Sequence, residues 1–208
     1  MTRRPALLDD YDKARFFCEM LDGAKRDPRI ALILERLAQL PPEELQRRTE
    51  IAEAELFNLG ITFTVYSEKD AIDRILPFDL IPRVLTPGEW AHLEAGVVQR
   101  VAALNAFLWD IYHDQKILKD GVVPTALVVG NANFRREMVG LDVPHRTYVH
   151  VCGVDVVRDE HGKFLVLEDN ARTPSGVSYV VENRHMMLRI FPDLFDDIEV
   201  RPVGNYGM

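Results

Sequence analysis

Two acids and one amide close to the ends of two apolar runs have side chains that could together bind a metal ion. Asp155 belongs to a run rich in Val and Tyr, Thr147–Arg158, while Glu168 and Asn170 follow a second short run that begins at Phe164. Carboxylate and amide oxygens are hard ligands, which suit Mg²⁺ because this ion prefers a few protein oxygens completed by water and substrate phosphate. These residue types indicate a Mg²⁺ site that needs no Cys or His.

Such ligands can meet only if the two runs are strands of one hairpin. The residues between them, 159–162, are Asp, Glu, His and Gly, which are typical of turns. Side chains alternate between the two faces of a strand, so Glu168 and Asn170 share one face and Asp169 points to the other. The pattern predicts an antiparallel hairpin with two of the three ligands on a common face.

The length of the turn decides whether Asp155 joins that face. A four-residue turn pairs Arg158 with Lys163, and Asp155 then lies on the face of Glu168, one diagonal step away. A three-residue turn built on Gly162 reverses the parity and places Asp155 on the other face, which is a poorer position for a charged group. We therefore predict the four-residue turn.

A phosphate site is indicated directly after the second strand. Arg172 follows Asn170 by two positions in an E-x-N-x-R pattern, and the segment TPSGVS, residues 173–178, precedes an apolar helical run. An arginine, a metal site and the free N–H groups of a helix N-terminus together describe a place for phosphate. The alternative is that the acids mark where a strand reaches solvent and that residues 173–175 are ordinary helix-start residues.

The whole segment GVDVVRDEHGKFLVLEDNARTPSGVSYVVENR resembles the signature of the circularly permuted ATP-grasp type 2 proteins, which are similar to glutathionylspermidine synthase. The upstream stretches GITFTVY, PFDLIPRVL, EWAHLEAGVVQRVAALNAFLWDIY and DGVVP look like the N-terminal half of that family. The resemblance extends from about Tyr11 to Pro202.

The resemblance implies an ATP- and Mg²⁺-dependent carboxylate–amine ligase that forms an amide bond through an acyl-phosphate. The positions that match the family's metal ligands are Asp155, Glu168 and Asn170. Arg172, together with Arg158, would stabilise the acyl-phosphate oxygens. The partners would be a small-molecule or peptide carboxylate and an amine.

Further residues are implicated around the start of the last helix. By the same resemblance, Ser175 and Ser178 would bind the carboxylate or phosphate, with Arg172 and Ser175 as the catalytic residues. Arg184 lies four residues after Val180 on that helix and is expected to point back to the site.

The fold expected from this comparison is α+β (mixed α/β), a circularly permuted and truncated ATP-grasp domain with an antiparallel metal-binding hairpin packed with helices. Residues 1–60 form an N-terminal helical segment, and residues 61–208 form the partial ATP-grasp domain. Members of the resembled family are longer, and their lysine-bearing sheet that grips ATP lies mostly beyond the position of residue 200. The chain is therefore expected to be an incomplete and inactive part of a ligase, with exposed hydrophobic surface and a tendency to self-associate. The alternatives are a non-catalytic nucleotide-binding or interaction module and a Mg²⁺-dependent phosphohydrolase.

Hydrophobic periodicity predicts the elements that must position these residues. Residues 29–40 and 42–59 should form a helical hairpin, followed by a strand at 61–66 and a turn at 67–70. A long core helix begins near Thr86 with a stripe at three- and four-residue spacing. The stripe contains Leu93, Val97, Val101, Leu104, Leu108 and Ile111.

Two further elements complete the prediction. The run PTALVVG, residues 124–130, reads as a short apolar strand, and residues 176–190 read as the last helix. The residues that this helix should bury are Val177, Val180, Val181, Met187 and Leu188. On the long helix, Arg100 is expected to pair with an acid of the same helix.

Composition excludes several classes of function. A formal net charge of −8 over 208 residues argues against nucleic acid as a partner, because backbone phosphates require a basic face. The chain lacks GxxxxGK[ST] and GxGxxG, and no apolar run is long enough to span a bilayer. Its two cysteines form no CxxC pattern, so neither zinc nor a disulfide framework is indicated and the expected location is the cytoplasm.

Overall fold

The computed structural model describes residue 8 and residues 11–66, 71–75 and 77–206, with the backbone alone described at 63–66 and 71–75. Two compact units make up the chain. Unit 1 contains residues 1–86, 159–162 and 175–208, and unit 2 contains residues 87–158 and 163–174. The predicted boundary at residue 60 concerns family domains rather than compact units, and it stays a prediction.

Unit 1 is built on three helices: α1 (Pro28–Ala38), α2 (Pro42–Asn58) and α6 (Val177–Ile190). The Asp27 side chain caps α1 by accepting the Arg29 backbone N–H at 2.8 Å, and Pro28 fills the first helical position. One face of α1 is buried in the core of the unit together with Leu56, Phe191 and Leu194. The buried residues of α1 are Ile30, Ile33, Leu34 and Leu37.

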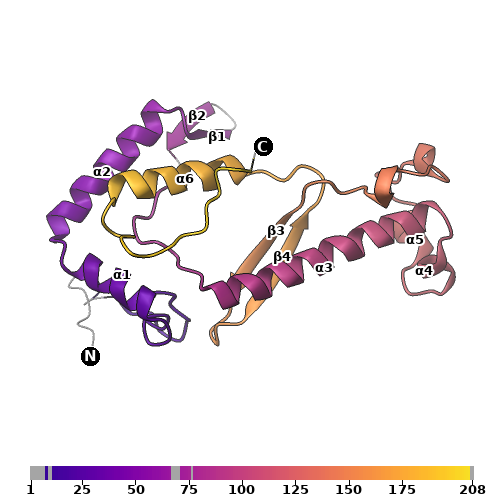
Figure 1. Ribbon diagram of the computed structural model, residues 1–208. Coiled ribbons are helices and arrows are strands. Elements are labelled where there is room, and N and C mark those ends of the chain that lie inside the picture. Colours follow the sequence, from indigo (N-terminus) through magenta and orange to yellow (C-terminus); the bar gives the residue numbers. More distant parts are fainter. Residues whose placement is uncertain (1–7, 9–10, 67–70, 76, 207–208) are drawn as a thin grey trace. The chain divides into compact units, whose positions relative to one another are not determined.

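The predicted hairpin of α1 and α2 is wrong in one respect. Both helices form, with Pro41 between them, but α2 packs along α6 rather than back along α1 (Figure 1). Arg48 donates to the Ile190 carbonyl at 3.0 Å, and Arg189 forms an ion pair with Glu55 at 2.7 Å. The apolar stripe of a helix indicates which face is buried, but it does not indicate which element covers that face.

The helix α6 buries a different face from the one predicted. Met186, Met187 and Ile190 are its buried residues, and of these only Met187 was expected. Val180 is 54% exposed and Leu188 is 47% exposed. The apolar residues of α6 surround most of its circumference, so the helical period alone could not select the face that meets α2.

A two-stranded sheet completes the regular structure of unit 1. β1 (Thr62–Tyr66) pairs antiparallel with β2 (Ala71–Ile75). The first strand confirms the prediction, whereas the second was not expected, since the adjacent charges Asp73 and Arg74 interrupt its apolar alternation. The predicted turn at 67–70 lies outside the described residues.

Unit 2 is organised along α3 (Pro87–Tyr112), beside which lies the hairpin of β3 (Gly153–Arg158) and β4 (Phe164–Asn170) (Figure 1). The start of α3 after Thr86 confirms the predicted helix. Its apolar stripe is half-buried, with Ile111 fully buried, so the predicted core helix is covered only in part. Within this unit, α3 is covered by the hairpin along one side.

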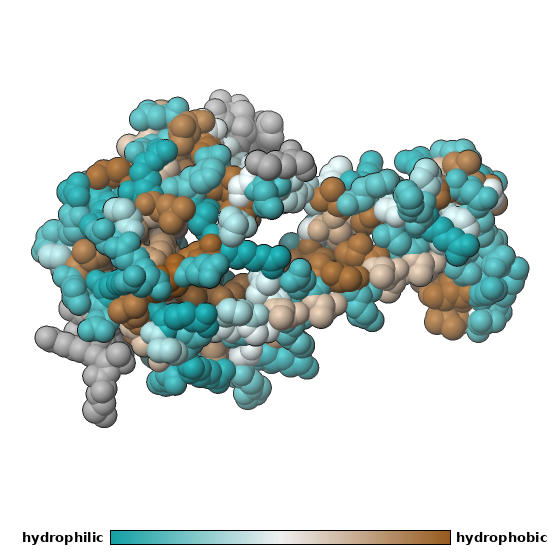
Figure 2. All heavy atoms as spheres, viewed as in Figure 1, coloured by the Kyte–Doolittle hydropathy of each residue, from teal (hydrophilic) through white to brown (hydrophobic). Residues whose placement is uncertain are grey.

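Short segments connect α3 to the hairpin. They are α4 (Lys116–Lys119), α5 (Thr125–Val128), η2 (Arg136–Met138) and η3 (Pro144–Arg146). The predicted strand at 124–130 is instead α5, because the chain turns helically after Pro124 and the Val129 N–H bonds to the Thr125 carbonyl at 2.9 Å. Figure 2 shows hydrophobic side chains on the surface beside α4 and α5, where Val122 and Leu127 are 71% and 67% exposed.

Candidate functional site

The hairpin β3–β4 is antiparallel, as predicted, but its register differs from the prediction. Arg158 pairs with Phe164 rather than with Lys163, so the connection contains five residues. Near this connection the pairing has the parity of the rejected three-residue turn. A β-bulge then changes the register between Val156 and Asp155, and Leu167 is the residue left without a partner.

The bulge restores the predicted shared face. Asp155 lies directly opposite Glu168, and Gly153 lies opposite Asn170. Because paired residues project to the same side of a sheet, Asp155, Glu168 and Asn170 occupy one face, which we call the front face. In an unbroken ladder Asp155 would oppose Leu167 instead.

The front face brings two negative charges together. Asp155 and Glu168 are both exposed, and the Asn170 amide donates to a Glu168 carboxylate oxygen at 3.2 Å. Within the described part of the chain neither carboxylate belongs to an ion pair. Like charges directly opposite each other in a sheet are destabilising, and a bound cation would relieve that repulsion.

The donor set fits a hard cation. Two carboxylates and one amide oxygen leave several positions for water and phosphate, which is the manner in which Mg²⁺ is usually bound. Pro174 packs closely against Gly153, since a Cβ at this position would come within 3.2 Å of the Pro174 ring and 3.6 Å of the Asn170 Cβ. The described residues contain no group of three His, Cys, Asp or Glu side chains that could hold a metal, so any site here depends on the Asn170 amide.

The opposite face of the hairpin, which we call the back face, is held against α3 by ion pairs. Arg158 donates to Glu89 at 2.8 Å, and its side chain is only 6% exposed. Its guanidinium lies 4.1 Å from the centre of the Phe164 ring. In this position Arg158 anchors the turn end of the hairpin to α3, and the phosphate role expected for it stays a prediction.

Asp169 makes the second ion pair of the back face. The Arg100 Nε lies 2.7 and 2.8 Å from the two Asp169 carboxylate oxygens. The hydrogen bond to Asp169 raises the pKa of Arg100, so the guanidinium keeps its charge. Arg100 thus pairs with an acid of the hairpin rather than with one of its own helix, which corrects the prediction.

A third contact explains why β3 begins later than predicted. The Asn105 side-chain oxygen of α3 accepts the backbone N–H groups of Tyr148 and Val149 at 2.7 and 2.9 Å. Those N–H groups are therefore not available to a ladder, and the strand begins at Gly153 instead of Thr147. Tyr148 also stacks on Tyr112 near the end of α3, with ring centres 5.7 Å apart.

The remaining candidate residues follow the hairpin. Arg172 is exposed in unit 2, two residues after Asn170. Ser175 and Ser178 belong to unit 1 and are exposed. The joint site that the sequence predicts for the two groups therefore stays a prediction.

The start of α6 lacks a side-chain cap. Gly176 occupies the N-cap position with φ of +95°, and among the described residues no side chain accepts the first N–H groups of the helix. These groups are therefore open to an anion. Arg184, farther along α6, donates to the Arg201 carbonyl at 2.8 Å, which holds the segment after the helix.

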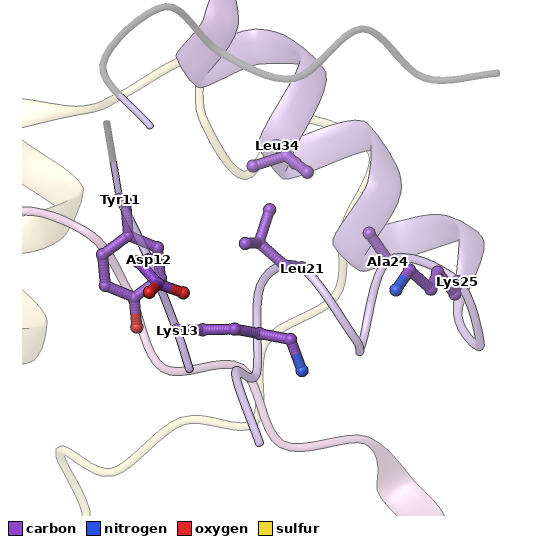
Figure 3. A pocket seen from close by; sticks show the side chains of 7 residues that line it. All are labelled: Tyr11, Asp12, Lys13, Leu21, Ala24, Lys25 and Leu34. Carbon is purple, nitrogen blue, oxygen red and sulfur yellow. The ribbon is translucent and has the colours of Figure 1, made fainter. Parts of the chain in front are cut away.

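Unit 1 also contains a hollow of about 360 Å³ near the N-terminus (Figure 3). Its wall includes Tyr11, Lys13 and Leu21, with Leu34 of α1. Lys13 is already paired with Asp22 at 2.7 Å. None of the candidate residues lines this hollow in the described part of the chain, and it adds nothing to the site.

Comparison with known proteins identifies the family. Residues 82–208 match a family model described as a circularly permuted ATP-grasp, which is more than half of the chain. The chain belongs to the circularly permuted ATP-grasp family. The front face of β3–β4 and the start of α6 both lie inside the matched residues of this ATP-grasp chain.

Several relatives resemble the ATP-grasp chain over nearly its whole length. An uncharacterized protein of Synechocystis is 45% identical over 201 residues, which are 96% of this chain and 42% of the relative. An uncharacterized protein of Mycobacterium leprae is also 45% identical over 201 residues, 96% of this chain and 35% of the relative. The chain thus spans less than half the length of each.

A more distant relative has a functional name. A Frankia alni protein named “Putative glutamate--cysteine ligase 2-3” is 39% identical over 194 residues, which are 91% of this chain and 22% of the relative.

Among the described helices, none combines the length and the apolar character needed to cross a membrane.

Sequence reasoning placed the three candidate ligands of the ATP-grasp hairpin on one face but missed the residues that support that face from behind. The Glu89–Arg158 and Arg100–Asp169 pairs and the Leu167 bulge were not predicted. The sequence did contain a signal for the two ion pairs. Strand alternation sends Arg158 and Asp169 to the same face, and charged side chains on a covered face need partners of opposite charge. The bulge had no such signal.

Proposed function

We propose that the front face of β3–β4 holds Mg²⁺ for an ATP-dependent carboxylate–amine ligase. The observation that carries the proposal is the direct opposition of Asp155 and Glu168 without a cation partner in the described part of the chain. A sheet tolerates such a pair poorly unless a cation is bound. The nucleotide in this proposal is ATP, because the chain belongs to the ATP-grasp family.

In the proposed reaction a substrate carboxylate takes the γ-phosphoryl group of ATP, which leaves ADP and an acyl-phosphate. An amine then attacks the acyl carbon, phosphate departs, and an amide remains. Bound Mg²⁺ would neutralise charge on the phosphates during transfer. Asp155, Glu168 and Asn170 would hold it, with the Asn170 amide turned so that its oxygen faces the ion.

Other residues of the chain would bind the transferred group. Arg172 carries a positive charge two residues beyond Asn170 and would bind the acyl-phosphate oxygens. The uncapped N–H groups of α6, with the hydroxyls of Ser175 and Ser178, would bind phosphate or the substrate carboxylate. Arg184 would contribute only if it exchanges its bond to the Arg201 carbonyl for one to phosphate.

The substrates we propose are amino acids or short peptides. The support is the name of the Frankia relative, which describes a ligase that joins two amino acids. Both the carboxylate and the amine would then carry a second charged group. The exposed Arg172, two residues after the hairpin, would pair with the carboxylate of such a substrate.

The proposal is tested by an assay that separates phosphoryl transfer from amide formation. The chain, and a version extended through the downstream reading frame, are incubated with ATP, Mg²⁺ and a panel of amino acids, and ADP and amides are quantified by liquid chromatography with mass spectrometry. We expect ADP and amide in equal amounts from the extended version with one pair of amino acids, no amide from the chain alone, and loss of both products in the extended Asp155→Asn variant. A charge-matched control is Asp12→Asn, at an exposed position of unit 1.

Three outcomes would contradict the ligase. ADP and free phosphate without amide, lost in Asp155→Asn, would favour the Mg²⁺-dependent phosphohydrolase. Nucleotide binding without ADP formation would favour the non-catalytic binding module. Equal behaviour of the wild type and Asp155→Asn would remove the front face from the function altogether.

A further inference from the structure

The back face of the hairpin stands in a fixed relation to the front-face ligands. Asp169 lies between Glu168 and Asn170 in β4, so its backbone is continuous with that of both ligands. Alternation sends its side chain to the back face, where it is 16% exposed and meets Arg100. Any displacement of Asp169 therefore displaces both ligands.

The two back-face ion pairs have matching spacing on helix and hairpin. Glu89 and Arg100 are eleven residues apart, which is about three helical turns and about 16 Å along one side of α3. Their partners, Arg158 and Asp169, belong to hairpin positions about 13 Å apart along the strands. The long arginine side chains bridge the difference, so α3 holds the hairpin at two points.

The bulge lies between these two points. Leu167 interrupts the ladder directly before Glu168, and a bulge leaves the backbone there with fewer ladder hydrogen bonds. Pairing with Phe164 and the Glu89 contact hold the hairpin on one side of the interruption. On the other side of the interruption, β4 is held by the ion pair between Asp169 and Arg100.

The front face gives the ligands little support of its own. Asp155 and Glu168 are exposed, and the Asn170–Glu168 hydrogen bond of 3.2 Å is the contact that joins two of the candidate ligand side chains. A ligand that is not already held in place must be ordered when the ion binds, which weakens binding. Support must therefore come through the backbone from behind.

We infer that Arg100 and Asp169 are positioning residues, which lock β4 beyond the bulge and so preset Glu168 and Asn170 for cation binding. The inference rests on the proposed Mg²⁺ site and adds to it the α3 residue that controls its affinity. Residues that hold metal ligands in position without touching the ion typically change metal affinity by about 10- to 100-fold when they are removed.

The decisive variant is Arg100→Gln, because two explanations predict opposite signs for it. Long-range electrostatics alone would strengthen cation binding when a nearby positive charge is removed. Loss of positioning would weaken it. The measurement is Mn²⁺ affinity, with Mn²⁺ as the probe for Mg²⁺, from the free-ion signal in electron paramagnetic resonance, with and without ATP.

We expect Arg100→Gln to weaken Mn²⁺ binding by about tenfold, and Arg100→Lys to recover most of the loss, since an ammonium can still donate to Asp169. Asp169→Asn should resemble Arg100→Gln, and the double variant should be no weaker than either single one. The charge-matched control is Arg83→Gln in unit 1, where the side chain is 83% exposed and the affinity should not change.

Affinity equal to or tighter than that of the wild type in Arg100→Gln overturns the inference. Should that variant fail to fold by circular dichroism, wild-type affinity in Asp169→Asn overturns it equally. Glu168→Gln separates the two proposals. If Glu168→Gln loses Mn²⁺ while Arg100→Gln retains it, only the positioning role fails, and if Glu168→Gln binds as the wild type does, the metal site and the positioning role both fail.

Discussion

Glu168 and Asp169 are neighbouring acids in one strand, and the fold gives them opposite tasks. Asp169 projects to the back face, is largely buried and is bound by Arg100. Glu168 projects to the front face, is exposed and faces another carboxylate, Asp155. An acid with a basic partner serves the structure, whereas an acid that faces a like charge is free to bind a cation.

The arginines of the same region show the same contrast. Arg158 on the back face is enclosed by Glu89 and the Phe164 ring. Arg172, beyond the end of β4, is exposed. The two faces of the hairpin thus separate structural charges from charges available to a ligand, and substitutions on each face should have effects of different kinds.

The largest expected effect is the loss of ligand-dependent stability from the front face. Saturating Mg²⁺–ATP should raise the melting temperature of the wild type, and at 100 times Kd the gain is about 2.7 kcal/mol. Glu168→Gln should abolish this gain, because it removes a ligand charge. Differential scanning fluorimetry with and without Mg²⁺–ATP measures it.

The control for that experiment is Glu43→Gln, an exposed acid in the first turn of α2. It removes the same charge from unit 1 and should keep the full gain. An identical gain in the wild type and Glu168→Gln would show that ATP and Mg²⁺ bind elsewhere.

The second effect compares the two arginines. Arg158→Ala should lower the free energy of unfolding by roughly 2–3 kcal/mol, because it leaves Glu89 without this partner and removes the stacking on Phe164. Arg172→Ala should change it by less than about 0.5 kcal/mol, as expected for an exposed side chain. Urea denaturation followed by circular dichroism gives both values. Equal losses would remove the distinction between a structural arginine and a ligand arginine.

A third prediction concerns Asp22 of unit 1, a carboxylate that is hydrogen-bonded to basic side chains. Partial burial opposes the charge on Asp22, but hydrogen bonds from the Cys18 backbone N–H and the Lys13 and Lys25 ammonium groups outweigh it and lower its pKa to about 2. A carboxyl whose pKa is lower in the folded state stabilises the fold above its unfolded pKa, near 4, and that contribution disappears as the pH falls toward 2.

Asp22→Asn should therefore destabilise the chain at pH 6 by at most about 2 kcal/mol, and the difference from the wild type should shrink at pH 2.5. Urea midpoints at the two pH values measure this. A difference that does not depend on pH would mean that shape rather than charge makes Asp22 stabilising.

The smallest expected effect comes from the bulge itself. Deleting Leu167 gives β4 a regular ladder in which Asp155 still opposes Glu168, because the register of Arg158 and Phe164 then continues unbroken. Mn²⁺ affinity should stay within about threefold of the wild-type value. A large loss would show that the bulge geometry, and not only the shared face, shapes the site.

The sequence supported some predictions because their causes are local. Helices α1 and α6 form close to where the apolar periodicity of the sequence places them, because that periodicity is a local property. The covered face of α6 was not predictable, because Val180 and Met187 are both apolar and only the packing of α2 chose between them. The late start of β3 was equally hidden, since it depends on Asn105, 43 residues before Tyr148.

The identity of the candidate ligands and their family was determined by the sequence alone. Residue types, alternation and the E-x-N-x-R spacing are short-range properties, and they named Asp155, Glu168 and Asn170 correctly as residues of one face. Only the tertiary structure decided which strand register brings these residues to one face and which contacts keep the hairpin in place. The five-residue connection and the Leu167 bulge each change the parity of the pairing, and their effects cancel. Ion pairs from α3 then hold the back of the hairpin, because a helix far away in sequence can supply charges that no local pattern records.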